Sequence, residues 1–323
     1  MALENIPAIA TSGSRAVRTL PFSQETFRKI ADRFFLHGSI SKVINRADVP
    51  IFTHASLDMG CRDSSQIFPA YGEGRDQLRG LATVSMLTRP LPSVYSCRST
   101  NVWDLDLALS VTYFPHCRLT FGVLYGCPRA IEREVIDRLK LTDESAWCHP
   151  LLLPGIFAEL ERCRHLKVVE QNIDDLEGEI FQLDFQPSIK EKIHNKDSST
   201  RNAEKKKAWL DTTYLRNGLV SWKTQLTKMA EHCDDLPQVL FNEQAFMLPR
   251  EAAMPEPTEN VAAKKTAQRA VELQQLQKIT RLVRDRIHAI VDEYEDKIRD
   301  TTVRVDGMAM ATQWASIHLQ LWT

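Results

Sequence analysis

The last sixty or so residues of the chain carry its most regular hydrophobic pattern. Apolar side chains recur three or four positions apart, in a run that repeats every eleven residues: Leu276, Ile279, Val283, Ile287, Ile290, Tyr294 and Ile298. The mean step is close to one turn of an α-helix, so a single apolar stripe can follow a nearly straight helix. The segment 264–321 contains no proline and one glycine. It is predicted to be one helix of roughly 80 Å. The seven apolar residues form its interaction stripe, which needs partner helices from this chain or from a second copy.

The amino-terminal half has a mixed pattern that predicts a small α/β domain over residues 21–147. Ser23 is a suitable N-cap for a first helix, and Gly38 lies just past the expected end. Apolar residues alternate with more polar ones over 105–112, which predicts a strand with one wetter face. This strand and residues 119–125 are expected to form an antiparallel hairpin. Further strands are predicted at 50–57, 81–87 and 94–97, short helices at 40–44 and 129–139, and a long loop at 60–80.

Residues 148–323 are predicted to be helical. One helix is expected over 157–183 and a second over 208–233, where Trp209, Tyr214 and Trp222 are interpreted as core residues. A polar, lysine-rich linker is predicted near 187–207 and a proline-bearing one near 237–263. Residues 1–20 are expected to form a flexible arm. The predicted fold class is therefore α+β, with a small mixed domain, an antiparallel helical layer and a long stalk-like helix at 264–321.

Composition narrows the classes of function. The chain has 323 residues, 43% hydrophobic and 26% charged, with a formal net charge of -1. Nucleic acid is not expected as a partner, because binding to phosphates needs a surplus of Lys and Arg. Its seven cysteines are scattered, and the amino terminus lacks an apolar core. Together these features predict free thiols, no secretory signal and a cytoplasmic location.

No stretch reaches the roughly 18 to 20 consecutive apolar residues that a membrane helix requires. The chain is therefore predicted not to cross a bilayer, and to be membrane-associated only in a longer form that carries transmembrane helices.

Candidate metal and catalytic groups are sparse. Cys148-His149 and Cys163-x-His165 contain zinc-type ligands, but their spacing matches no finger or ribbon. Buried thiols and ordinary histidines are the preferred interpretation. An acidic group on the first long helix has the oxygen ligands that a divalent cation takes, although solvated helix charge is preferred: Asp174, Asp175, Glu177 and Glu179. No nucleophile elbow, zinc-protease motif or phosphate loop is present. The chain is predicted not to be an enzyme, and no catalytic or cofactor-binding residue is assigned.

Four segments together carry a resemblance to a known family. Residues 101–115, 118–127 and 149–162 resemble the amino-terminal part of fungal CorA-like proteins, which are relatives of the CorA magnesium transporters. Residues 305–314 resemble the stretch that those proteins carry shortly before their membrane helices. The resemblance covers about residues 25–314, with its segments in the same order. It implies a cytosolic α/β domain, a helical layer and a long stalk helix that leads to a pore.

The resemblance also sets expectations about ions and assembly. Stalks of the CorA family assemble as a pentamer around the ion path, and a Gly-Met-Asn tripeptide lies at the selectivity mouth. Here Gly307-Met308-Ala309 departs from that tripeptide, and the sequence ends at Thr323 where the spans are expected. No pore residue or regulatory metal ligand can be matched to a position in this chain. Mg²⁺ is the only cofactor candidate that the resemblance raises, and its ligands are unknown.

Two functions are compatible with these observations. The first is the cytosolic portion of a CorA-like, divalent-cation transporter-related protein, lacking the pore, not competent for transport alone and assembled as a homo-oligomer. The alternative is a helical adaptor that binds a partner protein's helix through the stripe from Leu276 to Ile298.

Overall fold

The computed structural model describes residues 22–45, 49–56, 91–99, 106–115, 117–184, 195–241 and 259–321. The elements, in chain order, are α1 (Gln24–Arg33), α2 (Ile40–Asn45), β1 (Ile51–Ser56), β2 (Ser93–Arg98), β3 (Ala108–Phe114), β4 (Leu119–Tyr125), α4 (Arg129–Leu141), a short 3₁₀ helix η3 (Glu144–Cys148), α5 (Leu152–Asp184), α6 (Asn195–Val239) and α7 (Glu259–Leu321). The predicted α+β class is confirmed. The expected arm at 1–20, loop at 60–80 and strand at 81–87 lie outside the described residues.

The chain folds into two compact units. The first unit comprises Met1–Leu160 and Gln225–His288, and the second comprises Glu161–Thr224 and Ala289–Thr323. The transitions between them fall inside α5, α6 and α7. This division differs from the predicted one at 147/148, because each of these three helices contributes residues to both units.

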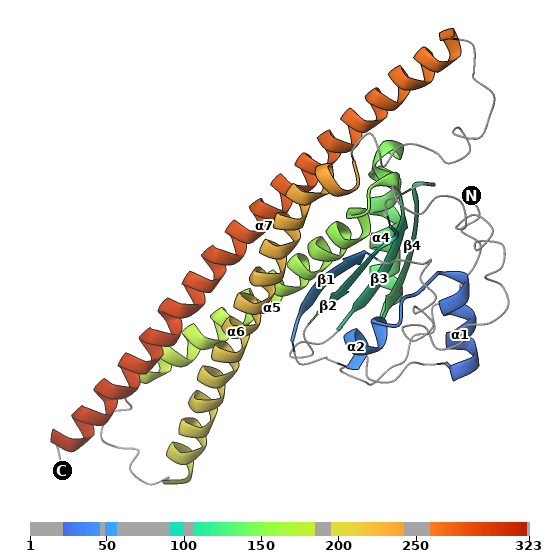
Figure 1. The fold of residues 1–323 in the computed structure, drawn as a ribbon. Coiled ribbons are helices and arrows are strands. Elements are labelled where there is room, and N and C mark those ends of the chain that lie inside the picture. Colours follow the sequence, from blue (N-terminus) through green and yellow to red (C-terminus); the bar gives the residue numbers. More distant parts are fainter. Residues whose placement is uncertain are drawn as a thin grey trace. The chain divides into compact units, whose positions relative to one another are not determined.

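The first unit is built around an antiparallel sheet with strand order β1-β2-β3-β4 (Figure 1). Tyr95 on β2 lies opposite Val111 on β3, and Val111 lies opposite Gly122 on β4. The predicted hairpin is confirmed as β3 and β4. Because side chains alternate along each strand, these three residues share one face of the sheet, and their sequence neighbours share the other.

Helices α1 and α2 cover one face of the sheet. Their apolar residues form a cluster with Ala108 and Tyr125. The Ser23 side chain accepts a hydrogen bond from the Thr26 amide at 3.2 Å, so the predicted N-cap is confirmed. The expected wetter face of β3 is wrong, since every residue of that strand is buried. Short polar residues fit there because they find partners: the Thr112 hydroxyl donates to the Phe35 carbonyl at 2.7 Å.

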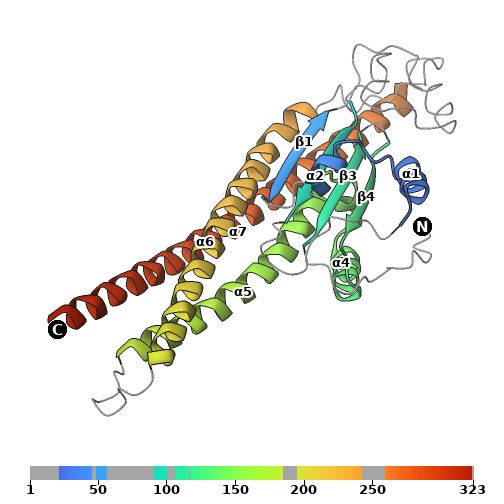
Figure 2. The same ribbon diagram turned by 90° about the horizontal axis from the view of Figure 1, so that it is seen from below.

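The opposite face of the sheet packs against longer helices. A Cβ atom added to Gly122 would lie 2.5 Å from a terminal methyl of Leu153 on α5, so a glycine allows the close approach of helix and strand. Along the free edge of β1, the Phe52 amide donates to the side-chain oxygen of Gln225 on α6 at 3.1 Å. The carboxyl-terminal part of α6 runs beside β1 in both views (Figures 1 and 2). An edge amide of the sheet is thus satisfied by a helix side chain.

One ion pair is fully enclosed beside the sheet. Arg98, at the end of β2, donates to Asp106 at 2.8 Å, and both side chains are at most 1% exposed. The Ser99 hydroxyl accepts a hydrogen bond from the Leu107 amide at 2.6 Å. A buried charge is tolerated only when it is paired in this way, so the pair fixes how the chain leaves β2 and enters β3.

The second unit contains segments of three helices. Arg162 on α5 pairs with Glu293 on α7, and further along Glu170 pairs with Lys297, so α5 and α7 run in the same direction. Fully buried apolar and aromatic side chains form the centre of this unit: Val169, Leu215, Leu219, Trp222, Ile290 and Tyr294. Trp222 is in the core as expected, whereas Tyr214 is 59% exposed and Trp209 is 36% exposed. The core interpretation of these two aromatics is therefore wrong.

The helices are longer than the sequence pattern predicted. Helix α6 begins at Asn195 and ends at Val239, so the predicted linker at 187–207 is helical from residue 195 onward. That segment is polar, but it contains four Lys and one Arg and lacks Gly and Pro, so no residue in it strongly disfavours helix. Helix α7 begins at Glu259 instead of 264, which shortens the second predicted linker. Among the described helices, none is apolar over a long enough stretch to cross a membrane.

Candidate functional site on the long helix

The predicted interaction stripe of α7 is mostly buried within the chain itself. Leu276, Ile287, Ile290 and Tyr294 are 1–4% exposed. The other three stripe residues, Ile279, Val283 and Ile298, are half-buried. The pattern correctly identified the face of the helix that packs. Of the two predicted sources of partner helices, this chain or a second copy, the burial of these four residues within one chain favours the first.

Within the first unit, a buried histidine is hydrogen bonded to α7. His149, which precedes α5, places Nε2 3.0 Å from the Thr280 hydroxyl. That hydroxyl donates to the Leu276 carbonyl at 2.9 Å, so it accepts from His149. The Leu151 amide donates to Nδ1 of the same ring at 3.2 Å. These three bonds require a neutral ring with its proton on Nε2.

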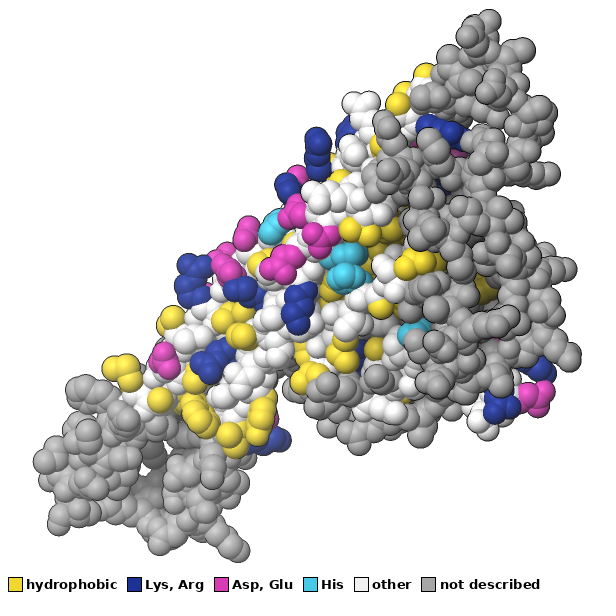
Figure 3. Space-filling model, viewed as in Figure 1, with side chains coloured by type: hydrophobic (Ala, Val, Ile, Leu, Met, Phe, Trp, Pro, Cys, Tyr) yellow, Lys and Arg dark blue, Asp and Glu magenta, His cyan; other side chains and the backbone are white. Residues whose placement is uncertain are grey.

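Ion pairs at the surface also join α7 to other parts of the first unit. Arg118 pairs with Glu272 at 2.8 Å, and Arg286 pairs with Glu159. Along α7, Lys/Arg and Asp/Glu side chains are interspersed and do not gather by sign (Figure 3). Such pairs contribute little each, and mixed charge of this kind is typical of a solvated helix face.

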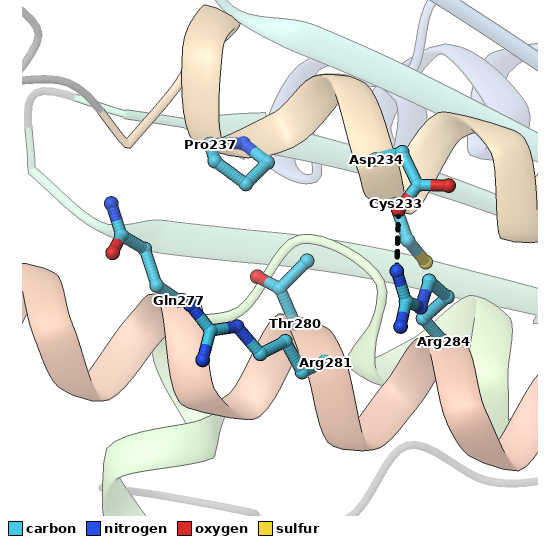
Figure 4. Close-up of a pocket in the computed structure, with 7 residues that line it drawn as sticks. All are labelled: Cys233, Asp234, Pro237, Gln277, Thr280, Arg281 and Arg284. Atoms are coloured by element: carbon cyan, nitrogen blue, oxygen red, sulfur yellow. Dashed lines mark hydrogen bonds and ion pairs between the residues drawn. The ribbon is translucent and has the colours of Figure 1, made fainter.

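A cleft of about 190 Å³ lies between the last turns of α6 and the middle of α7 (Figure 4). Its lining residues are Cys233, Asp234, Pro237, Gln277, Thr280, Arg281 and Arg284. Arg284 pairs with Asp234 at 2.9 Å and with Asp285 at 3.2 Å. The arginines line the cleft beside the carboxyl-terminal end of α6, where the helix dipole favours positive charge.

The thiol in this cleft is not a nucleophile. Burial, and secondarily the nearby Asp234 carboxylate, raise the pKa of Cys233 to about 12. The reactive form of cysteine is the thiolate, so this side chain stays protonated and inert near neutral pH. The cleft is therefore explained by helix packing and charge compensation.

A second polar network is enclosed in the second unit. The Tyr294 hydroxyl on α7 lies 2.5 Å from Nδ1 of His165 on α5, and Nε2 of His165 lies 3.1 Å from Glu161. Arg164 also donates to Glu161, at 2.5 Å. Glu161, His165 and Tyr294 are at most 2% exposed. The rings of His165 and Trp222 on α6 are nearly perpendicular, with ring centroids 6.4 Å apart.

The charge state of this network follows from its geometry. Burial alone would raise the pKa of Glu161, but Arg164 and His165 hold it below its usual range, so the carboxylate is ionised. Burial lowers the pKa of His165 and raises that of Tyr294. His165 is thus neutral, donating from Nε2 to Glu161 and accepting from the tyrosine hydroxyl at Nδ1.

The same network resembles a catalytic relay only in its residue types. A substrate atom cannot reach groups that are at most 2% exposed unless the helices separate. The network therefore acts in packing: the hydrogen bond between Tyr294 and His165 fixes the lateral position and rotation of α5 against α7.

The sequence-derived metal candidates are not brought together. Within the described part of the chain, no group of three or more His, Cys, Asp or Glu could hold a metal ion. His149 and His165 use both ring nitrogens in the bonds above. Cys163 is exposed, contrary to the expected buried thiol. Asp174 is exposed, and the side chains of Asp175, Glu177 and Glu179 lie outside those the structure describes.

Comparison with known proteins identifies no relative: no family model, no curated protein and no solved structure matches this chain.

Proposed function

We propose that this chain is the cytosolic part of a CorA-like, divalent-cation transporter-related protein, in which α7 is the element that joins neighbouring copies. The proposal comes from the resemblance of residues 101–115, 118–127, 149–162 and 305–314. The order of elements is compatible with it: a small mixed domain is followed by two long helices and then by α7.

The observation that carries the proposal is α7 itself. It is a single helix of 63 residues, which spans roughly 95 Å at about 1.5 Å per residue. Beyond its buried stripe, α7 also has large apolar side chains in solvent. Val271, Leu282, Val303 and Met310 are 60–66% exposed. These residues are the candidates for contact between copies, because the stripe residues already pack within one chain.

Light scattering coupled to size-exclusion chromatography tests the assembly at tens of micromolar protein, with and without millimolar Mg²⁺. A homo-oligomer is expected, and Leu282→Glu and Val303→Glu are expected to dissociate it. Lys278→Glu is the matched control, since it changes charge at an exposed position of the same helix. A monomer under all conditions would refute assembly through α7. An identical mass and melting temperature with and without Mg²⁺ would count against a role in cation sensing.

The adaptor alternative is tested in the same variants. If Leu282→Glu or Val303→Glu abolishes capture of a heterologous helical protein while the chain itself stays monomeric, the adaptor function replaces the transporter-related one. Binding of a partner helix along the Leu276–Ile298 stripe is not favoured, since the stripe is largely buried.

A further inference from the structure

Three histidines gather in the first unit on the sheet face that packs against the long helices. His54 on β1 stacks on His232 of α6, with ring centroids 3.8 Å apart and planes 22° apart. Nε2 of His232 lies 3.3 Å from the Tyr95 hydroxyl on β2. His149 contacts Thr280 as described above, and the nearby His232 contributes to lowering the pKa of His149.

Stacking excludes a shared metal ion between His54 and His232. A histidine nitrogen binds a metal through a lone pair that lies in the plane of its ring, at about 2.0–2.1 Å. Two nearly parallel rings direct their lone pairs alongside one another, so the lone pairs do not converge on one point. The property that these histidines share is therefore proton binding.

His149 cannot bind a second proton in the folded unit. Its ring is fully buried, and the proton would have to enter at Nδ1, which already accepts from the Leu151 amide. Protonation would turn an acceptor into a donor that faces another donor. Burial, and secondarily the nearby His232, lower the pKa of His149 to about 3.

His232 is also buried, but its second ring nitrogen faces no donor, so a second proton there is opposed by burial and by the lack of an anionic partner. It is 7% exposed, and its Nδ1 has no hydrogen-bond partner. The groups that face its ring are His54 and Phe52 from β1 and Tyr95 from β2, none of which carries a negative charge. The acidic side chains nearest in sequence, Glu231 and Asp234, are exposed and form no ion pair with it. Burial, and secondarily His54, lower the pKa of His232 to about 4.

We propose that His149 and His232 form a proton-operated latch in the first unit. In the neutral form, His149 ties the entry of α5 to α7, while His232 ties α6 to the sheet. On acidification, both rings bind protons when these contacts open, so proton uptake favours release of α6 from the sheet and of α7 from the entry of α5. This inference is independent of the proposed function.

The expected change in the population of the open form follows from the difference in histidine pKa between the closed and the open form. A histidine in an open, solvated segment has a pKa near its ordinary value of about 6.5. The pKa values of both histidines in the closed form lie below this ordinary value. The histidines therefore stabilise the closed form fully above pH 6.5, and this stabilisation is lost as the pH falls from about 6.5 toward 4. Between pH 7.5 and 5.5, each histidine should raise the population of the open form about tenfold, and the two together about a hundredfold.

Hydrogen exchange of the full chain, measured by mass spectrometry, tests the latch. The rates are corrected for the intrinsic pH dependence of amide exchange. Peptides from 225–239 and 276–288 should show about a hundredfold more opening at pH 5.5 than at pH 7.5. His149→Gln and His232→Phe should each leave about a tenfold change, and the double variant almost none. His288→Gln, which removes an exposed histidine of α7, is the control and should retain the hundredfold change.

A measurement on the unmodified chain covers the case in which a variant does not fold. Exchange of the histidine C2 hydrogen gives the titration midpoint of each ring by mass spectrometry. Midpoints below about 5 at His149 and His232 are expected. A midpoint near 6.5 at either ring, a wild-type change in opening below about threefold, or an undiminished change in the double variant would each overturn the latch.

Discussion

Replacing Tyr294 by phenylalanine isolates one buried hydrogen bond between α5 and α7. The substitution keeps the aromatic ring but removes the hydroxyl that donates to Nδ1 of His165 at 2.5 Å. Both residues are at most 2% exposed, so no water replaces the lost donor. A buried acceptor left without a partner costs about 1–3 kcal/mol. The free energy of unfolding of the second unit is expected to fall by that amount at pH 7.5.

Because the chain forms two units, the effect should be measured separately in each. Native-state hydrogen exchange of peptides from 161–169 reports on the second unit, and peptides from 108–114 report on the first. A loss of about 1–3 kcal/mol corresponds to opening that is about 5- to 150-fold more frequent. Tyr214→Phe is the matched control, because this tyrosine of the same unit is 59% exposed. Its effect should stay within about 0.5 kcal/mol.

Two results would refute this reasoning. If Tyr294→Phe behaves like Tyr214→Phe, the hydroxyl does not hold α5 to α7. If peptides of both units are destabilised equally, the hydrogen bond acts on the whole chain and the division into units is wrong for unfolding.

Three further predictions test the packing elsewhere. Ile290→Ala should cost about 2–5 kcal/mol in urea denaturation, whereas Leu282→Ala, at an exposed position of α7, should cost less than about 0.5 kcal/mol; equal costs would contradict the assigned orientation of the helix. Asp106→Asn should cost about 3–5 kcal/mol, because it leaves the buried Arg98 guanidinium without its anionic partner, and an unchanged melting temperature would contradict that pairing. Gly122→Ala should cost about 1 kcal/mol by calorimetry, since only the end of a flexible leucine on α5 has to move; a stabilised variant would show that helix and strand are not in close contact.

Much of the fold could be predicted because its signals are local. The N-cap at Ser23, the hairpin of β3 and β4, and the face of α7 that packs all follow from neighbouring residues. The polar start of α6 differs from the predicted linker because polarity alone does not distinguish a linker from a solvated helix. The absence of Gly and Pro over 195–207 was the available signal. The buried polar face of β3 depends on helices elsewhere in the chain.

The polar contacts of the candidate site could not be predicted in the same way. His165 and Tyr294 are separated by 129 positions, and His149 and Thr280 by 131. Nothing local specifies which helix faces meet over such separations. One signal was present: Thr280 follows Leu276 by four positions, so this polar residue continues the apolar stripe. A hydroxyl at a core-facing position has to find a partner.

The location of the unit boundaries limits how the molecule can be dissected. Each crossing from one unit to the other occurs in mid-helix: between residues 160 and 161, between 224 and 225, and between 288 and 289. Excising either unit would create new helix ends, each with up to four unpaired backbone groups. Neither half is therefore expected to be recovered by limited proteolysis at a linker or by expression of a fragment, and biochemical experiments should keep the polypeptide whole.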